Sequence, residues 1–61
     1  MELKLKQFRN SLKISQESFA KKLGISTSFY IKVELGERNP SFNFLKKLKK
    51  VFNVNIDEMF F

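Results

Sequence analysis

The sequence has no cysteine and no histidine, and only one proline and two glycines among its 61 residues. Without cysteine there are no disulfides, and without cysteine and histidine the usual zinc ligands are missing. The same absence removes the most common general base and the thiol nucleophile of enzymes. The six acidic residues show no pair placed for acid–base chemistry. We therefore expect no metal, no cofactor and no enzymatic activity.

Long hydrophobic runs are also absent. No stretch approaches the roughly 18 apolar residues of a membrane span. The first residues, MELKLKQF, hold no long apolar run of the kind found in secretion signals. We therefore expect a cytoplasmic protein that does not cross a membrane.

The chain does contain enough apolar residues to fold. Hydrophobic residues make up 43% of it, and eight of them are phenylalanines, which argues against a disordered basic tail. A domain of about 60 residues buries only ~60% of the surface of its unfolded chain. We expect a single domain over residues 1–61, with one small core built from packed helices and dimerisation as a possible reinforcement.

Charge is unevenly balanced, because 12 basic residues stand against six acidic ones and give a net charge of +6. An excess of this size favours a polyanionic partner, either nucleic acid or an anionic membrane surface. Lysine-rich small domains are also often basic only for solubility. The position of the charges has to decide between these interpretations.

Apolar residues recur at helical spacing through most of the chain, and serines at positions 15, 26 and 41 stand where N-caps would begin new helices. We expect helices over about residues 2–12, 16–23, 27–35, 42–52 and 56–60, which makes an all-α domain. Leu12 belongs to the apolar face of the first helix. The apolar face of the fourth is expected to comprise Phe44, Leu45, Leu48, Val51 and Phe52. The paired lysines 46–47 and 49–50 fall on its other side and are typical of a solvated face.

The centre of the chain, residues 15–36, consists of two short helices joined by a tight turn at residues 24–26. Gly24 suits the end of the first helix, and Ser26 suits the N-cap of the second. The second helix has one face that its core residues leave free, and this face carries Thr27, Ser28, Ile31 and Lys32. Hydroxyl, methyl and amine groups of this kind suit the base edges and phosphates of a DNA major groove.

An ordered set of residues in this region resembles a known family. The set comprises Gln16, Ala20, Gly24, the Ile25–Ser26 turn, Val33, Glu34, Gly36 and the run Arg38–Asn39–Pro40–Ser41. It resembles the Cro/phage-repressor (XRE-like) helix-turn-helix domain, and the likeness extends from Leu5 to Phe60. The resemblance implies a compact five-helix bundle of the lambda-repressor-like type with a central helix-turn-helix.

The resemblance also implies which residues would meet double-stranded DNA. By matching positions, Thr27, Ser28 and Lys32 are candidates for base readout, and Ile31 joins them either through a thymine methyl group or as a stray exposed apolar residue. Thr27 and Ser28 could equally donate to phosphates. The candidates for contacts with the DNA backbone are Gln16, Lys13, Ser26, Arg38, Asn39 and Ser41. Gln16 would also buttress the first residues of the recognition helix, unless it is a solvated surface residue.

Two further positions are interpreted through the resemblance. Arg9 would form a partly buried ion pair with Glu34, which locks the first helix to the third; the alternative, which we favour less, is a contact between Arg9 and DNA. Tyr30 departs from the family, which prefers isoleucine or valine there. Its larger side chain is expected either to tilt the recognition helix or to push its hydroxyl to the surface.

The sequence ends with three large apolar residues, Met59, Phe60 and Phe61. Phe60 is expected to close the core, and Met59 and Phe61 to form an exposed patch. Because the last helix of the resembled family often forms a twofold contact, these three residues are the predicted homodimer interface.

The leading hypothesis is therefore a small transcriptional regulator, most simply a repressor, that binds DNA as a dimer. Two recognition helices would enter successive major grooves about 34–36 Å apart on a roughly palindromic operator. The alternative is a protein-interaction module, such as an antitoxin-like partner, that uses the same fold. A membrane-active cationic peptide is disfavoured, because the ordered caps and turns specify a globular bundle.

Overall fold

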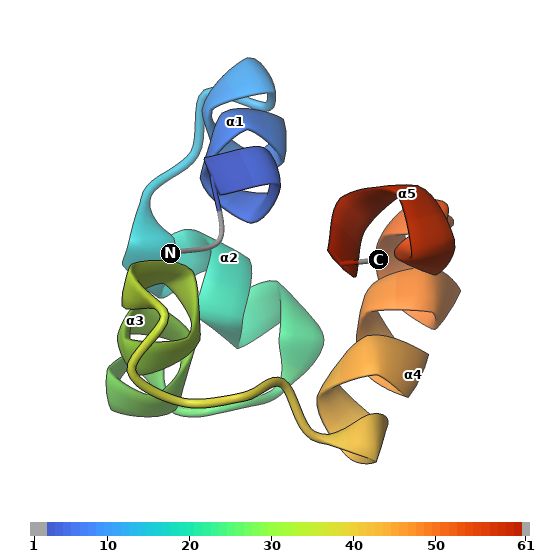
Figure 1. The fold of residues 1–61 in the computed structure, drawn as a ribbon. Helices are drawn as coiled ribbons and strands as arrows, with labels where there is room; N and C mark the ends of the chain where they lie inside the picture. The colour runs from blue at the N-terminus through green and yellow to red at the C-terminus, as the bar shows by residue number, and fades with distance from the viewer. Residues whose placement is uncertain (1–2, 61) are drawn as a thin grey trace.

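The computed structural model describes residues 3–60, which form five α-helices joined by short turns (Figure 1). They are α1 (Leu3–Ser11), α2 (Gln16–Leu23), α3 (Thr27–Leu35), α4 (Phe42–Phe52) and α5 (Ile56–Phe60). The prediction of an all-α, five-helix domain is confirmed. Among these residues, no helix is long and apolar enough to cross a membrane.

The first helix ends earlier than expected. The α-helix stops at Ser11, and the N–H groups of Leu12 and Lys13 close a turn by donating to the carbonyls of Arg9 and Asn10, both at 3.0 Å. Lys13 then adopts a left-handed conformation with φ of 57°, which no helix can continue. Leu12 is consequently 40% exposed and does not belong to the core. The expected start at residue 2 lies outside the described residues.

Local capping explains why the remaining helices begin and end where they do. The side-chain oxygens of Ser15, Ser26 and Ser41 each accept a hydrogen bond of 3.1 Å from the backbone N–H three residues later. Helices α2, α3 and α4 end at residues with positive φ, namely Gly24 (71°), Gly36 (82°) and Asn53 (54°). The residues that end each of these helices therefore lie within a few positions of the helix end, and no distant contact is needed to explain them.

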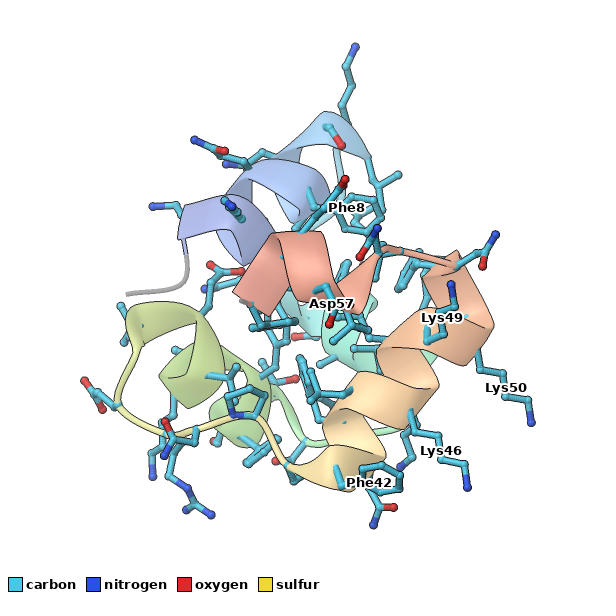
Figure 2. All side chains as sticks on the ribbon, turned by 45° about the vertical axis from the view of Figure 1, so that its right-hand side comes forward. Phe8, Phe42, Lys46, Lys49, Lys50 and Asp57 are labelled. Atoms are coloured by element: carbon cyan, nitrogen blue, oxygen red, sulfur yellow. The ribbon has the colours of Figure 1, made fainter. Side chains whose placement is uncertain are left out.

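Helix α2 occupies the middle of the domain (Figure 1). It packs against α3 and α4, while α1 packs against α3 and α5. The α3–α4 loop runs along the lower end of the molecule in Figure 1. Phe42, the first residue of α4, lies at the same end (Figure 2). This arrangement leaves one side of α3 and one side of α4 uncovered.

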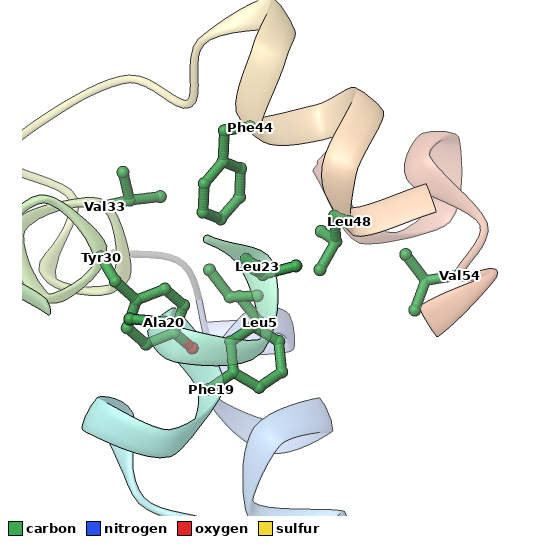
Figure 3. Close-up of a cluster of buried hydrophobic side chains, with 9 residues drawn as sticks. All are labelled: Leu5, Phe19, Ala20, Leu23, Tyr30, Val33, Phe44, Leu48 and Val54. Carbon is green, nitrogen blue, oxygen red and sulfur yellow. The ribbon is translucent and has the colours of Figure 1, made fainter. Parts of the chain in front are cut away.

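The core is small, and three of its nine buried hydrophobic residues are aromatic. Its buried hydrophobic residues, shown in Figure 3, are Leu5, Phe19, Ala20, Leu23, Tyr30, Val33, Phe44, Leu48 and Val54. The ring of Phe19 stacks on Phe52 with 4.7 Å between centroids and lies 4.9 Å from the ring of Tyr30. Tyr30 in turn contacts Phe44 at 6.3 Å. These ring contacts join α2, α3 and α4 into one packed unit.

Besides Leu12, two apolar residues differ from their predicted burial. Val51 is 47% exposed, although it was expected on the apolar face of α4. It lies at the edge of that face, where the small domain has no further element to cover it. Met59 is half-buried and packs against the core, as Phe60 does, so it is not the exposed residue that was predicted. The short helix α5 lies against α1 and turns both side chains partly inward. Phe61 lies outside the described residues.

Candidate nucleic-acid interface

Helix α3 presents one free face because its other face is buried in the core. Tyr30, Val33 and Glu34 point inward, and each is at most 4% exposed. The opposite side carries Ser28 and Lys32, which are exposed, and Leu35, which is 48% exposed. The three- and four-residue steps along this side place hydroxyl, amine and methyl groups on one helix surface. Side chains with these groups can contact the edges of base pairs in a major groove.

Thr27 and Ile31 lie on the border of this face and are half-buried. The prediction of an exposed Ile31 is therefore wrong in degree. Ile31 stands four residues from both Thr27 and Leu35, and side chains at this spacing shield one another on a helix.

The N-terminal end of α3 has features that favour binding of an anion. Ser26 caps it through the N–H of Phe29, and the first turn holds no acidic residue. The hydroxyl oxygen of Ser26 is used as an acceptor, so its O–H group is available to donate to a phosphate. The partial positive charge of the helix terminus adds to this preference.

The chain after α3 folds back toward the same surface. The carbonyl of Lys32 accepts hydrogen bonds from the N–H groups of Glu37 (2.8 Å) and Arg38 (3.2 Å). The guanidinium of Arg38 lies over the ring of Phe29, 5.5 Å from its centroid, which limits its freedom before any ligand arrives. Asn39 beside it is exposed. The loop therefore holds a pre-positioned cation next to the free face of α3.

Helix α4 begins directly after this loop with a second open terminus. Ser41 caps it through the N–H of Phe44 at 3.1 Å, and its first turn is also free of acidic residues. Lys13 is exposed in the turn between α1 and α2. The remaining backbone candidate, Gln16, is the first residue of α2 and is half-buried.

Beneath the free face, Glu34 is the centre of a buried polar network. Its carboxylate accepts hydrogen bonds from Arg9 Nε at 2.9 Å and Arg9 Nη2 at 3.2 Å, which makes a two-point ion pair between α1 and α3. Arg9 Nη1 also donates to the carbonyl of Ile14 at 2.9 Å. Only 4% of Glu34 is exposed. Removing one partner of such a pair is therefore expected to cost far more than breaking a surface ion pair.

Two further donors complete the network around Glu34. Gln16 Nε2 donates to its Oε1 at 3.0 Å, and the hydroxyl of Tyr30 donates to its Oε2. Gln16 thus contacts the last turn of α3 and not its first residues, and its second N–H is left for another acceptor. Tyr30 is fully buried, so its hydroxyl does not reach the surface as one expectation held. A valine or isoleucine at position 30 would leave this oxygen of Glu34 with Arg9 alone.

The network shifts the pKa values of its members in a consistent way. Burial by itself would raise the pKa of Glu34, but the hydrogen bonds from Arg9, Tyr30 and Gln16 outweigh it and hold this pKa below its ordinary value. The hydrogen bond to Glu34 raises the pKa of Arg9, and burial raises the pKa of Tyr30. Arg9 and Glu34 are therefore charged and Tyr30 neutral across the physiological range.

Sequence reasoning missed two exposed apolar residues near this surface. Leu35 continues the free face of α3, and Phe42, the first residue of α4, is 77% exposed. Both were overlooked because helical spacing alone cannot tell which apolar residues the small core leaves uncovered. Within residues 3–60, no cluster of acidic side chains could hold a metal ion.

Comparison with known proteins agrees with this geometry. A family model described as helix-turn-helix, HTH_3, matches residues 5–59. An uncharacterized HTH-type transcriptional regulator of Methanocaldococcus jannaschii, MJ0272, is 40% identical over 60 residues, which cover 98% of this chain and 91% of that protein. A second, from Archaeoglobus fulgidus, is 33% identical over 60 residues and covers 98% and 84%. The control protein C.MunI of Mycoplasma sp is 34% identical over 58 residues and covers 93% and 78%. No solved structure gives a significant match.

Proposed function

Because the chain belongs to the HTH_3 helix-turn-helix family of DNA-binding transcriptional regulators, we propose that it recognises one operator sequence and represses transcription there. Membership confirms the predicted Cro-like family and the lambda-repressor-like fold, and the chain is a regulator and not an enzyme. The name of one relative, a control protein, agrees with a regulatory role for so small a domain.

The observation that carries the proposal is the free face of α3. Its exposed side chains, Ser28 and Lys32, stand beside the edge residues Thr27 and Ile31 and are the proposed base-reading set. Lysine donates to the acceptors of guanine, the hydroxyls accept or donate, and the isoleucine methyl suits thymine. Helix α3 would lie in the major groove with its N-terminal end closest to the bases.

The proposed anchors on the sugar-phosphate backbone come from the α1–α2 turn, the start of α2, the cap of α3, and the α3–α4 loop with the cap of α4. They are Lys13, Gln16, Ser26, Arg38, Asn39 and Ser41. Five of them are exposed, and Gln16 is half-buried with one N–H still free to donate. Phosphate contacts set the register of the helix in the groove and carry no sequence information themselves.

We further propose that two copies bind together across a palindrome. The contact would use α5 and the turn before it, where a shallow groove is lined by Phe8, Val54 and Met59. Met59 and Phe60 are half-buried, so they would contribute only their outer edges, and Phe61 is the third candidate. Repression would follow from occupancy of an operator that overlaps a promoter, in the cytoplasm where such an operator lies.

The test is a selection of duplexes from a random library at about physiological salt, followed by sequencing. Enrichment of a palindrome with half-sites one helical turn apart, about 34–36 Å, would support specific binding by a dimer. Binding without enrichment would contradict sequence readout and leave a non-specific phosphate-binding surface. Absence of binding to every duplex would favour the alternative, an antitoxin-like module for a protein partner. Sedimentation of the protein with and without the selected duplex would test the dimer separately.

A further inference from the structure

The ring of Phe29 is fixed at one border of the free face of α3. Phe29 follows Ser28 by one residue and precedes Lys32 by three, so the geometry of an α-helix places it beside both. Its backbone N–H donates to the side-chain oxygen of Ser26 at 3.1 Å. Its half-buried ring packs edge-on against Phe44, with 6.0 Å between centroids and 66° between ring planes. Because Phe44 is only 1% exposed, the core holds the ring of Phe29 in position.

The α3–α4 loop brings the side chain of Arg38 over this ring. The backbone N–H of Arg38 donates to the carbonyl of Lys32 at 3.2 Å, which fixes the base of the side chain against α3. Its guanidinium carbon lies 5.5 Å from the centroid of the Phe29 ring. An arginine side chain is long and loses much rotamer freedom when a ligand immobilises it. Because both ends of Arg38 are already held, less freedom remains to be lost on binding.

The contact with the ring leaves the hydrogen-bond donors of Arg38 available. The donors of a guanidinium lie in its plane, whereas an aromatic ring attracts the cation through the face of the ring and accepts no conventional hydrogen bond from it. A carboxylate partner would occupy the same donors that a phosphate needs. Within residues 3–60 the only ion pair is Arg9–Glu34, so no carboxylate there holds Arg38. Phe29 therefore restricts Arg38 without competing with an anion.

We propose that Phe29 is a positioning residue for DNA binding, whose ring holds the guanidinium of Arg38 in the orientation that meets a backbone phosphate. This inference rests on the proposed function, in which Arg38 is a phosphate anchor. Phe29 contributes no charge in this role. It raises the fraction of molecules in which Arg38 is ready to bind, and the apparent affinity rises with that fraction. Since a phosphate carries no base information, the effect is the same on every DNA sequence.

The experiment is a double-mutant cycle between Phe29→Leu and Arg38→Ala. Leucine keeps an apolar side chain against the core and removes the ring face. Affinity for the selected operator and for a scrambled duplex is measured between about 50 and 200 mM salt. With Arg38 present, we expect Phe29→Leu to weaken binding to both duplexes about two- to fivefold, the range expected of an exposed cation–π contact. In the Arg38→Ala background, the same change should leave the affinity unchanged.

The salt dependence separates positioning from charge. Phe29→Leu leaves Arg38 charged, so the slope of log affinity against log salt should not change, whereas Arg38→Ala should lower it by about 0.9. Phe29→Tyr keeps the ring face and should retain the native affinity.

Phe52→Leu is the control for lost packing. Phe52 is also half-buried, and its ring stacks on Phe19 at 4.7 Å, but it is no part of the proposed interface. Phe52→Leu should lower the midpoint of urea unfolding without changing the affinity for either duplex. Circular dichroism would show that every variant is folded under the conditions of the binding assay.

NMR of the DNA-free protein tests the contact itself. Side-chain protons of Arg38 that lie over an aromatic face should resonate upfield of the same protons in Phe29→Leu. Equal chemical shifts in the two proteins would overturn the inference.

Two results with DNA would also overturn it. Equal losses of affinity with and without Arg38 would mean that Phe29→Leu acts through packing. Unchanged or higher affinity of Phe29→Leu with Arg38 present would mean that the ring does not hold the guanidinium in its binding orientation. These results differ from failure of the proposed function, in which the native protein itself binds no duplex.

Discussion

The hydroxyl of Tyr30 offers the sharpest test of the polar network, because Tyr30→Phe keeps the ring and removes one donor. The ring is fully buried and packs on Phe19 and Phe44, and the substitution leaves these contacts in place. The hydrogen bond that it removes runs to the charged carboxylate of Glu34, which is 4% exposed. Hydrogen bonds to charged groups contribute about 1.5–3 kcal/mol, and we expect the free energy of unfolding to fall by that amount.

For a domain this small, the change is a large fraction of its stability. At about 0.05–0.15 kcal/mol per residue, 61 residues give a free energy of unfolding of about 3–9 kcal/mol. A change of 1 kcal/mol moves the melting temperature of such a domain by about 4–8 °C, so Tyr30→Phe should lower it by roughly 6–24 °C. Urea unfolding at pH 7 should show a lower midpoint with an unchanged slope.

A double-mutant cycle with Glu34→Gln isolates the pair. In the Glu34→Gln background the hydroxyl meets a neutral amide, so the same Tyr30→Phe change should cost only about 0.5–1.5 kcal/mol. An equal effect in both backgrounds would mean that it comes from packing and not from the bond to Glu34. An effect below about 0.3 kcal/mol in the native background, which is well under the expected range, would refute the reasoning outright.

Three other predictions follow from the structure. Lys32→Ala should reduce the preference for one base at one operator position by about 1–3 kcal/mol. Arg38→Ala should instead weaken binding to all DNA sequences alike and lower the slope of log affinity against log salt by about one unit. If Lys32→Ala weakens binding to operator and random DNA equally, Lys32 does not read a base. Gly24→Ala should lower the free energy of unfolding by about 1–2 kcal/mol because φ at this position is +71°; no steric clash contributes, since nothing lies within 4 Å of the added Cβ. Gly24→Asn should lower the free energy of unfolding by less, because asparagine tolerates this conformation better. Equal losses for the two variants would contradict a conformational cause. Folding lowers the pKa of Glu34, so the stability that its carboxylate contributes is present above about pH 4.5 and is lost as the pH falls below that value. Folding raises the pKa of Tyr30, so the stability that its neutral hydroxyl contributes is present below about pH 10 and is lost as the pH rises above it. Urea unfolding across this range should show the gap between native protein and Tyr30→Phe narrowing above about pH 10, and a constant gap would contradict the assignment.

The sequence by itself determined the elements and their order. The signals that begin and end the helices are local. A serine side chain caps a helix by reaching a backbone N–H three residues away. Gly24 and Asn53 end helices because residues of these types adopt positive φ without help from the rest of the chain. The helix-turn-helix core could therefore be predicted from spacing, and so could the inward positions of Tyr30 and Val33 on α3. The outward side was predicted only in part, because Ile31 is half-buried and Leu35 was missed. The weakest local signal, at the end of α1, produced the one wrong boundary.

Only the tertiary structure decided how side chains from different helices share space. The sequence suggested an ion pair between Arg9 and Glu34. It did not show that Gln16, which lies 18 residues before Glu34, and Tyr30, which lies four residues before it, donate hydrogen bonds to the same carboxylate. The exposure of Phe42 and Val51 and the partial burial of Met59 likewise depended on which elements happened to lie opposite. The physical reason is that helical periodicity specifies only the direction of a side chain, whereas burial and hydrogen bonding depend on what the folded chain brings to meet it.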